Sequence, residues 1–150
     1  MFSFKSDSIR CIISTFAAPG GEGKSVNPFS RRSVEHYLAR FASAADGLLE
    51  QDIRASFHDS FEYDGDWCDD FFRQFRRRRG YRLQQHLPEL LGQGDPEVIA
   101  RVKCDYRETL SDLVLEGLVE PWVAWSHQKG MLARNQAHGS PGNWLDLYAA

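Results

Sequence analysis

The feature that most constrains this fold is an alternation, along the chain, of short β-type runs and longer helix-type runs. Residues 10–16 are β-branched and apolar, residues 53–61 alternate apolar and polar side chains, and residues 131–136 form a third short run. Each of these patterns predicts a strand. Because strands that alternate with helices usually pair in parallel through helical crossovers, the sequence predicts an α/β fold with a parallel sheet.

The intervening helices are predicted from apolar residues spaced three and four apart, with capping residues at their ends. The expected helices run from a cap at Ser30 or Ser33 to Gly47, from Asp66 or Asp69 to Gly80, over residues 84–91, from Asp95 to Gly130, and from residue 143 onward. Pro121 lacks a backbone N–H and should kink or divide the helix that begins at Asp95.

Three strands and these helices amount to a fraction of an eight-stranded (β/α)8 TIM barrel, which takes about 250 residues. We therefore expect residues 1–150 to form a single, helix-rich domain, which is a segment of such a barrel with parallel strands. The hydrophobic content of 42% is sufficient for a core.

Charge and composition exclude several classes of protein. The formal net charge of −3 provides no global field for nucleic acid or a membrane surface. The N-terminus has no signal-peptide pattern, and no run is long enough to span a membrane. Arg76 to Arg79 suggest a phosphate contact, but four consecutive residues point to all sides of a helix, so a solvated helix end is expected instead.

In β/α barrels the active site lies at the carboxyl ends of the strands, which here are residues 58–62 and 134–139. Glu62 stands at a strand end between Phe61 and Tyr63. Aromatic surroundings can raise the pKa of a carboxyl group, which makes Glu62 the candidate general acid. The alternative is that Glu62 and Asp59 cap the following helix or face solvent in a loop.

Other polar and aromatic residues near these ends are candidates for substrate contacts. Asp59 could orient a partner side chain, and His138 lies in a loop of small residues after a strand. Trp67 could stack on a sugar or fill the core. The histidines lack zinc spacing, so no cofactor is predicted. The acidic cluster around Glu62 lacks the spacing of a calcium loop, and calcium stays open there as an alternative.

Six motifs together carry a family resemblance. They are SFHDSFEY (56–63), DW (66–67), FRRRRGY (75–81), DYRETLSD (105–112), RNQAHGSP (134–141) and LDLYA (145–149). In this combination, which covers roughly residues 20–150, the chain resembles the α-L-rhamnosidases of glycoside hydrolase family 106.

The resemblance implies hydrolysis of terminal α-L-rhamnosyl linkages in polysaccharides, on a barrel that is one domain of a larger secreted or periplasmic enzyme. Glu62 matches the family's acid, and Asn135 and His138 match a loop that faces the sugar. The implied inverting mechanism needs a second carboxylate about 6.5 to 9.5 Å from the acid. Relatives continue beyond Ala150 into a further strand with acidic residues, so we expect a truncated, inactive fragment that lacks this base.

The residues also leave a second function open. The chain could be a non-catalytic carbohydrate-binding or interaction module. An incomplete barrel also exposes strand edges and apolar helix faces, so self-association is expected for the isolated chain.

Overall fold

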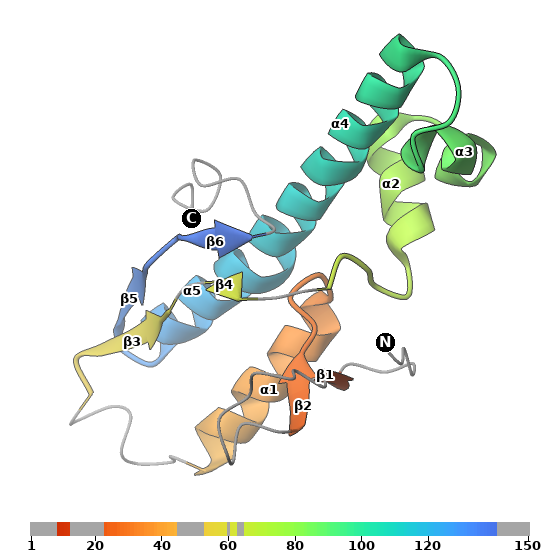
Figure 1. The fold of residues 1–150 in the computed structure, drawn as a ribbon. Coiled ribbons are helices and arrows are strands. Elements are labelled where there is room, and N and C mark those ends of the chain that lie inside the picture. Colours follow the sequence, from red (N-terminus) through yellow and green to blue (C-terminus); the bar gives the residue numbers. More distant parts are fainter. Residues whose placement is uncertain (1–8, 13–22, 45–52, 60, 63–64, 141–150) are drawn as a thin grey trace.

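The computed structural model describes residues 9–12, 23–44, 53–59, 61–62 and 65–140 (Figure 1). The strands are β1 (Ile9–Ile12), β2 (Gly23–Val26), β3 (Ala55–His58), β4 (Phe61–Glu62), β5 (Leu132–Asn135) and β6 (Gly139–Ser140). The helices are α1 (Arg31–Ala44), α2 (Phe71–Arg79), η1 (Leu83–His86), α3 (Leu87–Leu90), α4 (Pro96–Val114), η2 (Leu115–Val119) and α5 (Glu120–Gln128). The helix expected from residue 143 lies outside the described residues.

The strands form three two-stranded sheets, of which two are parallel: β3 pairs with β5 and β4 pairs with β6. Helices α2 to α5 lie between the partners, as expected for a crossover. The expectation of a parallel partner for the strand near residue 10 is wrong, because β1 pairs antiparallel with β2. Residues 13–22 alone separate these two strands, which is shorter than the dozen or so residues that a parallel connection needs.

One long helical run forms the centre of the fold, and the other helices pack against two different parts of it (Figure 1). Helices α4, η2 and α5 follow one another without a break; α2 and α3 contact α4, whereas α1 contacts η2 and α5, and β5 contacts α5. This arrangement is a helix-rich α/β fragment. The buried side chains between these elements include Phe71 and Phe75 of α2, Val114 of α4 and Trp122 of α5.

The helix is divided before Pro121, as predicted. Residues of η2 form a π-helical segment, in which the N–H of Glu120 donates to the carbonyl of Leu115, five residues earlier. Pro121 follows at the start of α5 and has no N–H to offer the carbonyl of Gly117. The π-helical turn therefore lies where Pro121 interrupts the regular hydrogen bonds of the helix.

Gly117 in this π-helical segment allows a close approach of the chain before α1. A Cβ at Gly117 would lie 3.3 Å from the carbonyl oxygen of Pro28 and 3.4 Å from the amide nitrogen of Arg31. Both atoms belong to the backbone and cannot rotate away. Glycine is thus the residue that lets η2 contact the start of α1.

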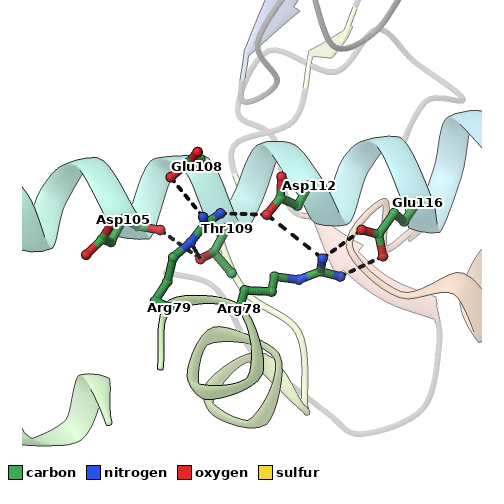
Figure 2. A network of polar contacts seen from close by, with 7 residues as sticks. All are labelled: Arg78, Arg79, Asp105, Glu108, Thr109, Asp112 and Glu116. Carbon is green, nitrogen blue, oxygen red and sulfur yellow. Dashed lines mark hydrogen bonds and ion pairs between the residues drawn. The ribbon is translucent and has the colours of Figure 1, made fainter. Parts of the chain in front are cut away.

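Two arginines join α2 to α4 (Figure 2). Arg78 donates two hydrogen bonds to Glu116, at 2.6 and 2.7 Å. Arg79 contacts Asp112 at 2.5 Å and Glu108 at 2.8 Å, and its Nε donates to the hydroxyl of the buried Thr109. The Thr109 hydroxyl in turn donates to the carbonyl of Asp105. Both guanidinium groups of this contact therefore have carboxylate partners, and Nε of Arg78 is the one nitrogen of the two groups that is buried without a partner among the described residues.

The expectation of a solvated arginine run is therefore wrong for its second half. The side chains of Arg78 and Arg79 are 13% and 14% exposed, whereas Arg76 and Arg77 are exposed. The reason is tertiary: α4 and η2 present acidic side chains every fourth residue, at 108 and 112 of α4 and at 116 of η2, to the end of α2.

We expect Gly117→Val to lower the free energy of unfolding by roughly 1–3 kcal/mol, because the new side chain must displace backbone atoms of residues 28–31. Ala124→Val is the matched control, since Ala124 is exposed in α5 and the substitution adds the same β-branched side chain to a helix. Urea unfolding measures both. A Gly117→Val variant as stable as the control would contradict the close packing of η2.

We expect Arg78→Ala to cost about 1–2 kcal/mol, because it removes a bidentate pair that is partly shielded from water. Hydrogen bonds from Arg78 lower the pKa of Glu116 below its usual 4.5, while burial opposes this. The contribution is therefore full above pH 4.5 and is lost as the pH falls through the lowered pKa. Urea unfolding at pH 7 and pH 3 should show the difference shrinking in acid, with the exposed Arg76→Ala variant as control.

Candidate active site

The two parallel ladders bring the predicted strand ends together. His58 pairs in register with Asn135, and Glu62 pairs with Ser140. Between the ladders, the N–H of Gln136 donates to the carbonyl of His58 at 3.0 Å, and the N–H of Phe61 donates to the carbonyl of His138 at 2.7 Å. The structure therefore places residues 58–62 beside residues 135–140, as the sequence predicted.

The segment between β5 and β6 is one residue longer than the segment between their partner strands, β3 and β4. Ala55 pairs with Leu132 and Phe61 pairs with Gly139, so the first side advances six residues (61 − 55) and the second seven (139 − 132). This is a bulge, and it contains Ala137, a buried residue with φ of 50°. Bulges bend a strand and change the direction of its side chains, and they are frequent beside active sites.

The Asn135 side chain stabilises this bulge. Its Oδ1 accepts a hydrogen bond from the N–H of Ala137 at 3.1 Å, the two-residue turn that asparagine side chains favour. The left-handed conformation of Ala137 is unusual for a residue with a Cβ. Asn135 is therefore a structural residue of the site, a role that the sequence analysis did not foresee.

His58 belongs to the same place and was not among the predicted site residues. Its half-buried ring lies 4.5 Å from the ring of Phe61 and 5.8 Å from that of Trp122. Burial lowers its pKa, while the neighbouring Asn135 side chain and Asp59 act in the opposite direction. His58 is thus mainly neutral at pH 7. The only sequence signal was its place in the strand that ends at Glu62.

Two nitrogen atoms at this ladder have unused hydrogen-bonding capacity. Within the described residues, Nδ1 of His58 and Nδ2 of Asn135 are buried and have no hydrogen-bond partner. They belong to residues paired across neighbouring strands. Unpaired buried nitrogens are costly, but these two side chains lie within reach of each other, because the Asn135 side chain acts to raise the pKa of His58.

The structure describes the side chains of most of the predicted site residues, but not that of Glu62. The backbone of Glu62 is in β4, and its side chain lies outside the described part of the chain. Asp59 and His138 have exposed side chains. Trp67 lies against α2, with its ring centroid 4.9 Å from that of Phe71 and 4.7 Å from that of Phe72. These contacts are the core packing that the sequence analysis held open for Trp67, and its sugar-binding role stays a prediction.

Two further kinds of site are absent from the described ranges. In these ranges, no three histidine, cysteine, aspartate or glutamate residues lie close enough together to hold a metal ion. None of the described helices combines the length and apolar character needed to cross a membrane.

We expect Asn135→Ala to speed hydrogen exchange of the Ala137 amide and to cost about 1 kcal/mol, because this N–H loses its acceptor. Asn135→Asp is the control, since it keeps an oxygen at the same place. Amide exchange measured by NMR distinguishes the two. Equal exchange in the parent chain and in Asn135→Ala would mean that the bulge does not depend on this side chain.

Comparisons with known proteins agree with this geometry. The model of glycoside hydrolase family 106, alpha-L-rhamnosidase, matches residues 10–146. A solved rhamnosidase from Novosphingobium sp. PP1Y is similar in structure, with a TM-score of 0.69 and 26% identity over 95% of this chain. This chain spans 14% of the length of that rhamnosidase, and no curated protein matches it. Since the family model matches most of its length, the chain belongs to the α-L-rhamnosidase family, glycoside hydrolase family 106.

Proposed function

We propose that this chain forms one part of the catalytic (β/α)8 barrel of an α-L-rhamnosidase, which hydrolyses terminal α-L-rhamnosyl linkages in polysaccharides. The observation that carries the proposal is the meeting of residues 58–62 and 135–140 at the carboxyl ends of parallel strands. This is the end of a β/α barrel where active sites lie. The similarity to a solved rhamnosidase supports the same barrel.

Glu62 is the proposed general acid. It ends β4 next to Phe61, which is buried and in ring contact with His58. As a general acid, Glu62 would carry a proton at the start of the reaction. The Glu62 proton would pass to the glycosidic oxygen as its bond to the anomeric carbon breaks.

The proposed mechanism inverts the configuration at the anomeric carbon. A second carboxylate takes a proton from water on the opposite face of the sugar, and the resulting hydroxyl bonds to that carbon. The two carboxylates must stand about 6.5 to 9.5 Å apart to leave room for the water. We propose that this base belongs to the part of the rhamnosidase that the present chain does not match, since the chain spans 14% of the solved enzyme.

The substrate contacts are proposed for residues around the bulge. Asp59 and His138 have exposed side chains beside the two strand ends, where hydroxyl groups of a sugar can reach them. Asn135 ends β5 beside the bulge, and Trp67 offers the part of its ring that α2 leaves uncovered. No metal or other cofactor takes part in this proposal.

Exposed apolar side chains accompany the site. Phe57 of β3 is 55% exposed and Leu132 of β5 is 57% exposed, and these residues lie on adjacent paired strands. Apolar side chains on a sheet favour association. We propose that the isolated chain self-associates and that it releases no measurable rhamnose.

The test is release of 4-nitrophenol from an aryl α-L-rhamnoside by this chain and by a version extended to a complete barrel. We expect activity in the extended protein, a loss of about 10²–10⁴-fold in its Glu62→Gln variant, and little change in Glu35→Gln, which removes the same charge from the exposed face of α1. NMR of the product released first should show the inverted anomer. Full activity of Glu62→Gln would refute its role, and inactivity of every form would favour a non-catalytic carbohydrate-binding module.

A further inference from the structure

The arginines of α2 are divided between two faces of the helix. Arg78 and Arg79 turn toward α4 and are paired there. Arg73, Arg76 and Arg77 follow the spacing i, i+3 and i+4, which places them together on another face. Arg82 lies two residues after Gly80, the C-cap of the helix, and adds a fourth cation beside this face.

These four arginines line an open groove with a volume of about 690 Å³. Phe72, Asp69 and Asp70 also line it. Asp70 binds Arg73 at 2.7 Å. For Arg76, Arg77 and Arg82, the described residues provide no hydrogen bond or ion pair.

Arg76, Arg77 and Arg82 are exposed and bring like charges to the groove, and only Arg77 among them lies near enough to an acid of the described residues, Glu116, to help lower the pKa of its carboxyl group. In the same helix, Arg78 and Arg79 have carboxylate partners within 2.8 Å. Arg78 and Arg79 are thus matched with acids on α4 and η2, whereas the four arginines of the groove share two aspartates, Asp69 and Asp70. A bound anion would remove the repulsion there.

We propose that this groove binds the carboxylate groups of an acidic polysaccharide, at a position separate from the β4–β6 strand ends. The guanidinium fork matches a carboxylate with two parallel hydrogen bonds. That the anion is carried by a carbohydrate rests on the proposed function. Uronate residues along a glycan chain would meet Arg76, Arg77 and Arg82, and the partly buried ring of Phe72 would pack against the apolar face of a sugar.

Nucleic acid fits the groove less well. Its phosphates are closely spaced and would also approach Asp69 and Asp70, which line the same groove. Single strands are usually held by several aromatic side chains on which successive bases stack, and Phe72 is the one aromatic residue among those that line it.

The experiment is calorimetric titration of the chain with an oligomer of galacturonic acid at low salt. We expect binding that weakens as salt is added, that disappears when the oligomer is methyl-esterified and therefore neutral, and that is at least about tenfold weaker in Arg76→Gln/Arg77→Gln. Arg32→Gln/Arg40→Gln is the matched control, because both arginines are exposed on α1 and the change in net charge is identical. The control should bind as the parent does.

Arg82→Gln, a substitution outside the regular helices, should also weaken binding and guards against unfolding of α2 in the double variant. The proposal is overturned if the parent does not bind the oligomer, if both double variants lose binding equally, or if single-stranded DNA of equal charge binds more tightly. Because the probe contains no rhamnose and binding needs no turnover, failure of this proposal and failure of the rhamnosidase proposal are distinguishable.

Discussion

The parallel pairing of β3 with β5 is the constraint on which most of this structure depends. Two parallel strands cannot be joined by a tight turn, so the chain must leave the end of one strand and return to the start of the next. Here α2 to α5 make that connection. The same pairing brings the carboxyl ends of both strands to one edge, where the candidate residues lie. The helical crossover and the position of the candidate site therefore both follow from the parallel pairing of β3 with β5.

The crossover is held by both apolar and charged contacts. Phe71 and Phe75 are buried between α2 and its neighbours, whereas Arg78 and Arg79 reach acids on η2 and α4. Such a contact is specific, because a guanidinium group buried without its carboxylate would be strongly unfavourable. It also explains why one run of four arginines contributes to two surfaces with different chemistry.

The bulge at Ala137 links this architecture to function. Without the extra residue, the ladder of β3 and β5 would continue in register into β4 and β6. With it, the loop from Asn135 to His138 changes direction beside Glu62, and a side-chain hydrogen bond from Asn135 stabilises the turn. Asn135 was expected to contact the sugar, and the structure adds a local structural role.

Local sequence patterns predicted those elements whose signals are local. The helix from Asp95 begins where predicted, because the Asp95 side chain accepts hydrogen bonds from the N–H groups of Glu97 and Val98. Gly80 ends α2 with φ of 83°, which glycine adopts without strain. Pro121 divides the long helix, since the missing donor is a property of the residue itself. The meeting of residues 58–62 with 135–140 followed from the order of strands and helices.

Contacts between distant segments decided the rest. The antiparallel partner of β1, the burial of Arg78 and Arg79, the place of His58 between Phe61 and Trp122, and the bulge at Ala137 all depend on which residues lie opposite one another. The sequence alone determined the start of the helix at Asp95, the end of α2 at Gly80 and which family the motifs resemble, because capping and motif residues are read within a few positions. Only the tertiary structure determined partners and burial, because these depend on the side chains that another segment brings into contact.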